Sequence, residues 1–129
     1  MTIRIFLSII GALGVIHGAA FIIAPYEVAS IYGLEQSLGV AFVSRLFGAA
    51  LVAWGAILWL ARGFRDEAAV RAVLIATGVA EAISLCVVIL GTLAGTLNAM
   101  GWVAVLIYLF GAVGCLYFLT GPKRLAAGD

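Results

Sequence analysis

Charged side chains are scarce in this sequence: Asp, Glu, Lys and Arg make up 10% of its 129 residues, against about a quarter in an average soluble domain. Hydrophobic residues make up 66% of the chain and the mean hydropathy is +1.27, which leaves little polar surface to face water. The net charge is +1, so the chain has no basic excess with which to neutralise nucleic-acid phosphates. The composition excludes a soluble domain and a nucleic-acid-binding surface, and it indicates a membrane protein.

Residues that carry metal, redox or nucleophilic chemistry are also few. The one histidine, His17, cannot complete a metal coordination shell alone. The two cysteines, Cys86 and Cys115, form no CxxC motif, and we expect their depths to differ by about 10 Å, too far for a disulfide. The sequence has no phosphate-binding glycine loop or catalytic triad. We therefore expect no catalytic residues, no metal and no cofactor, and we favour a binding protein over an enzyme.

Long apolar runs are abundant. Four of them are long enough to cross a hydrocarbon layer of about 30 Å as helices rising about 1.5 Å per residue. A membrane β-barrel would need strands of alternating polarity, which these continuous runs do not show. We predict an all-α fold, an integral membrane four-helix bundle forming a single domain over residues 1–129, with spans at about 5–24, 38–61, 70–94 and 100–119.

The segment 25–33, PYEVASIYG, separates the first two runs. Proline at its start and glycine at its end are typical of a short helix, and its two tyrosines suit the headgroup region of a membrane. We predict a short interfacial helix between the first two spans. It either anchors the bundle or acts as a gate over a cavity.

The charges near the span ends are segregated by sign. Acidic residues, Glu27 and Glu35, follow the first run, whereas basic residues precede the first run, surround the second junction and follow the fourth run: Arg4, Arg62, Arg65, Arg71, Lys123 and Arg124. Basic residues favour the cytoplasmic side of a membrane. We therefore predict that both termini are cytoplasmic.

Glycine is common, with 16 residues, and it supplies the small surfaces through which helices associate in lipid. Pairs of glycines recur within each of the four runs at spacings that place both members on one helix face: Gly14 and Gly18, Gly48 and Gly55, Gly91 and Gly95, Gly111 and Gly114. We interpret these pairs as packing surfaces within the bundle rather than as a dedicated homodimer contact.

Three ionisable residues lie well inside the apolar runs, where a charge costs at least about 2.5 kcal/mol. They are His17, Arg45 and Glu81. On the third run, Thr77, Glu81 and Ser84 follow a helical spacing, so they form one polar stripe that must face the bundle. Tyr108 on the fourth run is expected at a depth similar to that of Arg45.

These residues allow several interpretations. The first is a structural ion pair between Arg45 and Glu81, with His17 or Tyr108 completing the hydrogen bonds. The second is a polar pocket, open toward the outer side, that binds a lipid-like or quinone-like molecule through His17, Arg45, Glu81, Tyr108, Thr77 and Ser84. The third is a proton-coupled transporter that acts as a homodimer. We take the pocket as the leading hypothesis, with membrane lipids as the surroundings and partners.

Three segments also resemble a known group of proteins: PYEVASIYG, SRLFGAALVAWGAILWLAR and GTLAGTLNAMGWVAVLIYL, at 25–33, 44–62 and 91–109. They are broadly similar to small bacterial four-span membrane proteins of the DoxX-like group. The resemblance implies a four-helix bundle in the bacterial inner membrane. Some members of that group are associated with quinone or thiosulfate oxidation complexes, so the resemblance also allows an accessory subunit of a larger membrane complex.

Overall fold

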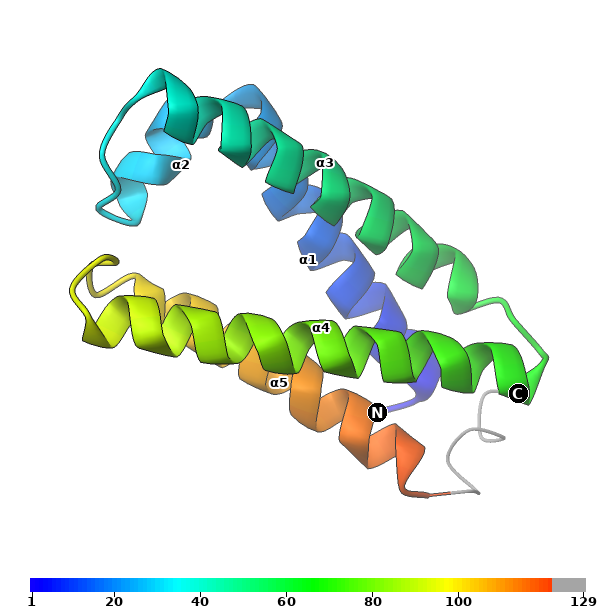
Figure 1. The fold of residues 1–129 in the computed structure, drawn as a ribbon. Helices are drawn as coiled ribbons and strands as arrows, with labels where there is room; N and C mark the ends of the chain where they lie inside the picture. Colours follow the sequence, from blue (N-terminus) through cyan, green and yellow to red (C-terminus); the bar gives the residue numbers. More distant parts are fainter. Residues whose placement is uncertain (122–129) are drawn as a thin grey trace.

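The computed structural model describes residues 1–121, and these residues form helices and connecting turns without strands (Figure 1). The helices are α1 (Ile3–Ile23), α2 (Pro25–Ile31), α3 (Leu38–Ala61), α4 (Glu67–Leu93) and α5 (Gly101–Leu119). The all-α prediction is confirmed, and the predicted spans agree with the four long helices to within three residues at every end. Lys123 and Arg124, predicted to mark the cytoplasmic side, lie outside the described residues.

The four long helices are apolar enough to cross a membrane. Many of their large side chains face outward, including Leu106 and Leu90, which are 65% and 66% exposed. A water-soluble bundle would bury such residues, whereas a bundle in lipid leaves them facing acyl chains of equal polarity. The chain is therefore a multi-pass membrane protein.

Local sequence signals fix the ends of the helices. The Thr2 and Ser37 hydroxyls accept hydrogen bonds from backbone N–H groups in the first turns of α1 and α3, and the Asp66 carboxylate does the same for α4. The predicted interfacial helix is present as α2, which begins at Pro25. It ends before Gly33, whose φ of +77° favours glycine.

Helices α1 and α3 form a pair whose backbones touch. A Cβ atom on Gly48 would lie 2.6 Å from the carbonyl oxygen of Gly18, and one on Gly55 would lie 2.6 Å from that of Gly11. Only glycine, which has a hydrogen atom in place of a side chain, lets the two helix backbones come this close. The predicted packing role of the glycines is confirmed for this pair, and Gly11 adds a contact that the glycine spacing did not predict.

Helices α4 and α5 form the second pair, an antiparallel hairpin (Figure 1). Here Gly78 faces Cys115, and Gly111 faces the carboxyl group of Glu81. The prediction that Gly91 and Gly95 form a packing pair is wrong. Gly95 has no heavy atom within 4 Å of a Cβ placed on it in the described structure, and its φ of +73° makes it a turn residue at the end of α4.

The two helix pairs meet in a core at the end of the bundle where α1 begins. The Phe6 ring lies directly against Gly114 of α5, and its centroid is 5.3 Å from that of Phe118. Leu58 of α3 and Leu74 of α4 are fully buried in the same cluster. We call this cluster the terminal core, and its buried members are Ile3, Phe6, Leu7, Ile10, Leu58, Ala61, Val70, Leu74, Cys115 and Phe118.

The glycine contact between α1 and α3 predicts a difference between two equivalent substitutions. Gly48→Ala should destabilise the bundle by about 1–3 kcal/mol, because the added methyl group forces the two backbones apart. Gly39→Ala, in the first turn of the same helix, should be neutral or stabilising, since the added Cβ would lie 3.9 Å from Ser37 Oγ and alanine favours helix. Thermal unfolding of both variants in detergent measures the difference. Equal melting temperatures would contradict the contact.

Candidate functional site

A cavity of about 220 Å³ lies between the two helix pairs, beyond the terminal core. Its inner end is formed by Ile10, which belongs to the terminal core. At the far end it is lined by Tyr32 and Leu34, from the segment after α2, and by Leu97, from the turn between α4 and α5. All four long helices contribute to its walls.

Glu81 is the acidic residue of this cavity, and it lies near the middle of the 27-residue helix α4. Its carboxyl group packs against Gly111 of α5, where a Cβ atom would approach Glu81 Cδ to 2.6 Å. Glu81 Oε2 is buried and has no hydrogen-bond partner within residues 1–121. A buried polar atom without a hydrogen bond lowers the stability of the fold by about 1–3 kcal/mol, and by more if the group is charged. The burial of Glu81 therefore needs a physical reason.

Trp54 of α3 contributes a second polar atom of the same kind. Its indole Nε1 is buried and makes no hydrogen bond in the described part of the chain, and its ring lines the cavity. An indole N–H is a donor, whereas a carboxyl oxygen is an acceptor. We call Glu81 Oε2 and Trp54 Nε1 the cavity polar atoms, because they are one buried acceptor and one buried donor on two side chains that line the cavity.

His17 of α1 also lines the cavity. Its Nδ1 lies 2.9 Å from the carbonyl oxygen of Leu13, so Nδ1–H donates to that oxygen. In the neutral ring Nε2 is then an acceptor. The bond from Nδ1 to the backbone of its own helix holds the ring in place beside the cavity.

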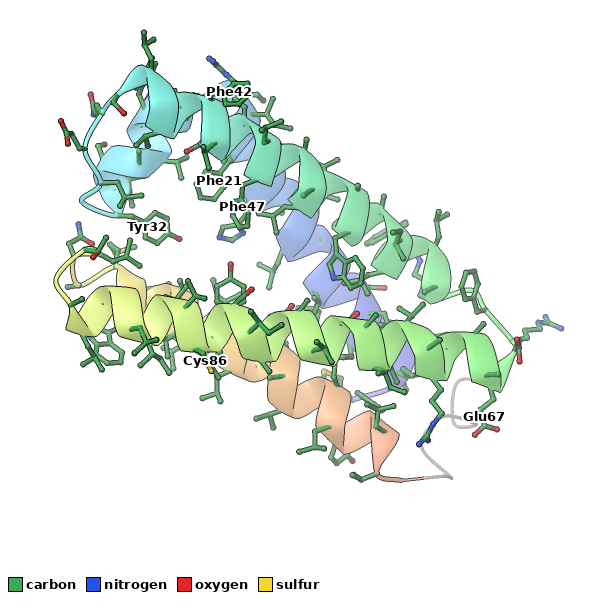
Figure 2. All side chains as sticks on the ribbon, viewed as in Figure 1. Phe21, Tyr32, Phe42, Phe47, Glu67 and Cys86 are labelled. Carbon is green, nitrogen blue, oxygen red and sulfur yellow. The ribbon has the colours of Figure 1, made fainter. Side chains whose placement is uncertain are left out.

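Aromatic rings form much of the remaining wall. Tyr32, Phe21 and Phe47 project from the α1–α3 side into the space facing α4 (Figure 2). The rings of Phe21 and Phe47 meet edge to face at 5.3 Å. Burial raises the pKa of the Tyr32 hydroxyl, so this phenol stays neutral and able to donate at physiological pH. Tyr108 of α5 completes the aromatic lining.

Two lining residues reach the outer surface of the bundle. Phe47 on α3 is 42% exposed and Phe110 on α5 is 41% exposed, although both line the cavity. Both residues belong to membrane-spanning helices, so their rings lie between the cavity and the lipid-facing surface of the bundle.

Asn98 closes the far end of the cavity by joining the two helix pairs. Its Nδ2 donates to the carbonyl oxygen of Ile31 at 2.9 Å, and its backbone N–H donates to that of Tyr32 at 3.0 Å. Its Oδ1 accepts from the N–H of Met100 at 2.9 Å, at the start of α5. One residue thus bonds both to Met100, which precedes α5, and to the segment that carries Tyr32. We call these hydrogen bonds the Asn98 clasp.

The structure brings His17, Glu81 and Tyr108 together as predicted, but not Arg45. Arg45 is exposed on α3, and the buried oxygen of Glu81 has no partner in the described residues, so the predicted Arg45–Glu81 ion pair is wrong. The buried stripe of α3 runs through Ser44 and Gly48, and a helix turns about 100° per residue, which points Arg45 out of the pair. Arg45 lies about 10 Å into the span, a depth from which an arginine side chain is long enough to reach the headgroups.

Thr77 and Ser84 are not among the cavity-lining residues either, although they share a helix face with Glu81. Thr77 is fully buried one turn nearer the terminal core, and its hydroxyl donates to the carbonyl oxygen of Val73 at 2.7 Å. Ser84 is half-buried on α4. The polar stripe is therefore correct as a face of α4 that turns inward, but only its central member reaches the cavity.

Sequence reasoning missed Trp54 and the Asn98 clasp. Phe47, Leu51 and Trp54 follow the spacing i, i+4, i+7 next to the glycine face of α3, so this signal was present in the sequence. No comparable pattern marks Asn98, because its partners are backbone carbonyl groups distant in sequence. The two cysteines, by contrast, are free as predicted, with Cys86 exposed and Cys115 buried.

The Asn98 clasp predicts how the far end of the bundle opens. Asn98→Asp keeps an oxygen to accept from Met100 N–H but has no amide to donate to Ile31. Asn98→Ala loses both side-chain bonds, at about 1 kcal/mol each. Hydrogen exchange at residues 31–34 should therefore rise in both variants, and exchange at the start of α5 should rise in Asn98→Ala more than in Asn98→Asp. Unchanged exchange at residues 31–34 would contradict the clasp.

Comparison with known proteins finds no matching family model, no similar curated protein and no similar solved structure. The resemblance to the DoxX-like group therefore stays a prediction.

Proposed function

We propose that this protein binds a small membrane-soluble molecule, lipid-like or quinone-like, in the cavity between its helix pairs. The observation that carries the proposal is a largely apolar and aromatic cavity whose lining residues include Glu81 and Trp54, each with a buried polar atom that has no partner in the described chain. Ligand sites are typically apolar hollows with a few polar groups that fix orientation. A molecule with a polar end would satisfy groups that the described chain leaves without partners.

The size and the lining of the cavity favour a planar ring as the polar end. A volume of about 220 Å³ is below the range of roughly 300–1,000 Å³ typical of drug-sized ligands, so it fits a ring better than a whole amphiphile. Aromatic side chains such as Phe21, Tyr32 and Trp54 offer edges and faces for stacking. The apolar tail would leave past Phe47 or Phe110 into the membrane.

The charge of the cavity argues against a phosphate headgroup. Glu81 would repel an anion, whereas a hydroxyl group could donate to its carboxyl group and an oxygen atom could accept from Trp54. A quinol ring carries both kinds of group on one plane. We therefore favour a quinone-like occupant over an anionic lipid, and we assign Glu81, Trp54, His17 and Tyr108 as its polar contacts.

We further propose the orientation that the sequence predicts, with both termini in the cytoplasm of a bacterial cell. Arg4, Arg62, Arg65 and Arg71 lie at the ends of helices or in the turn beside the terminal core, whereas Glu27 and Glu35 lie at the opposite end. This segregation supports the positive-inside assignment. The cavity and α2 then lie toward the outer side of the membrane.

Binding of decylubiquinol to the purified protein in detergent tests the proposal. We expect saturable binding to the unmodified chain, weakened roughly tenfold or more by Glu81→Gln, because a hydrogen bond to a charged group contributes about 1.5–3 kcal/mol. Gly111→Ala should weaken binding as well, since the added methyl group displaces the Glu81 carboxyl group. Equilibrium dialysis measures both dissociation constants.

The matched control is Glu67→Gln, which removes an acidic residue from the exposed first turn of the same helix. It should bind decylubiquinol as the unmodified chain does. Dodecanol and dodecylamine, tested in parallel, show whether the cavity prefers the ring, an aliphatic chain or a cation. Absence of saturable decylubiquinol binding, or equal loss in Glu67→Gln and Glu81→Gln, would contradict a quinone-like occupant.

One observation favours a second candidate, a proton-coupled transporter acting as a homodimer. A carboxyl group near the middle of a membrane-spanning helix, beside aromatic rings, is suited to exchanging a proton for a lipophilic cation. In proteoliposomes, uptake of tetraphenylphosphonium should then depend on an imposed pH gradient and disappear in Glu81→Gln. Uptake that is the same with and without the gradient would exclude this candidate.

A further inference from the structure

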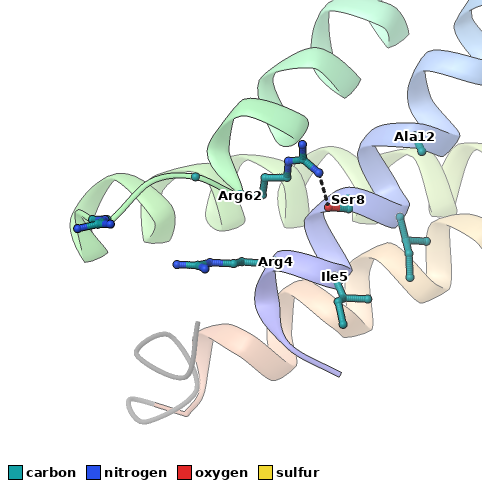
Figure 3. A pocket seen from close by; sticks show the side chains of 8 residues that line it. Arg4, Ile5, Ser8, Ala12 and Arg62 are labelled. Carbon is teal, nitrogen blue, oxygen red and sulfur yellow. Dashed lines mark hydrogen bonds between the residues drawn. The ribbon is translucent and has the colours of Figure 1, made fainter. Parts of the chain in front are cut away.

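A second hollow lies at the opposite end of the molecule, on the outer surface where α1 begins and α3 ends. It is an open groove of about 700 Å³. Figure 3 shows the Arg62 side chain reaching from the end of α3 to Ser8 on α1, with Arg4 one turn away on α1. We call it the arginine groove, and its lining residues are Arg4, Ile5, Ser8, Ile9, Ala12, Arg62, Gly63 and Arg65.

The groove carries three guanidinium groups and no carboxylate among its described lining residues. Arg62 is held in place, since its Nη1 donates to Ser8 Oγ at 3.5 Å and its guanidinium lies 3.7 Å from the centre of the Trp59 ring. The nearest acidic neighbour in sequence, Asp66, uses Oδ1 to cap α4. Within residues 1–121 no carboxylate lines the groove, so the three positive charges are available to an anion.

The apolar part of the groove continues along α1. Ile5, Ile9 and Ala12 follow the spacing i, i+4, i+7, so they form one stripe on the helix surface. Ile5 is 51% exposed and Ile9 is 38% exposed. The stripe runs from Arg4, in the first turn of α1, toward the middle of the span. Charges at the membrane face and an apolar stripe below them match the two parts of a phospholipid.

We propose that the arginine groove binds one anionic phospholipid. The phosphate lies between Arg4, Arg62 and Arg65, whose planar guanidinium groups match phosphate oxygens in pairs, and an acyl chain follows the stripe on α1. Basic pockets between membrane helices recognise anionic headgroups in this way. The site is distinct from the cavity of Glu81, shares no lining residue with it and does not rest on the function proposed for it.

Delipidated full-length protein in detergent, titrated with dioleoylphosphatidylglycerol or dioleoylphosphatidylcholine, tests this site by native mass spectrometry and thermal unfolding. We expect phosphatidylglycerol to bind with one-to-one stoichiometry and to raise the melting temperature more than phosphatidylcholine does. Arg4→Gln should weaken its binding roughly fivefold, as expected for loss of one basic residue near an anionic group. Arg62→Gln should weaken it further, because this side chain is already positioned by Ser8 and Trp59.

Arg71→Gln is the matched control, since Arg71 is exposed near the start of α4, outside the groove. It should bind phosphatidylglycerol as the unmodified chain does. If Arg62→Gln does not fold, Arg4→Gln decides, because this exposed residue caps no helix. Equal affinity for the two lipids, or equal losses in Arg4→Gln and Arg71→Gln, would overturn the proposal. If inorganic phosphate alone raises the melting temperature as much as phosphatidylglycerol does, the acyl-chain part of the proposal is overturned and the groove is a phosphate site.

Discussion

Two tight helix pairs are joined mainly at their ends, and the rest of this structure depends on this constraint. The backbones of α1 and α3 touch through glycines such as Gly18 and Gly48, and α4 and α5 form a hairpin of their own. The pairs then meet in the terminal core, where Phe6 packs against Gly114, and at the Asn98 clasp. The space between these two junctions is the cavity.

The cavity has an energetic cost that the rest of the bundle does not explain. In lipid, helices associate through close packing rather than through the hydrophobic effect, so an unfilled space forfeits contacts that the pairs would otherwise make. The cavity polar atoms add a second cost, because the described chain offers them no hydrogen bond. A bound molecule with an apolar body and a polar end would offset both costs, which is why binding accounts for the site better than a purely structural role for Glu81.

The sequence predicts the helices well because each of them is fixed by local features. Run length sets the spans, and Pro25 and Gly33 bound α2. The burial of Glu81 also follows from a local pattern, its stripe with Thr77 and Ser84. The surroundings of Glu81 did not follow from the sequence, since helix periodicity tells which residues share a face but not which neighbouring helix that face meets. Arg45 lies one residue from the buried stripe of α3, and the rotation of about 100° between neighbouring residues separates a buried ion pair from an exposed arginine.

The most direct test of the central claim is to identify which small molecule stays bound when the protein is extracted from the membrane. Native mass spectrometry of the gently solubilised chain, beside its Gly111→Ala variant, measures bound small molecules without assuming which one is present. The account predicts a specific adduct with the mass of a quinone or similar ring-bearing amphiphile on the unmodified chain, and its loss from Gly111→Ala, where the Glu81 carboxyl group is displaced. Absence of any adduct from the unmodified chain, or an identical adduct on both, would contradict it.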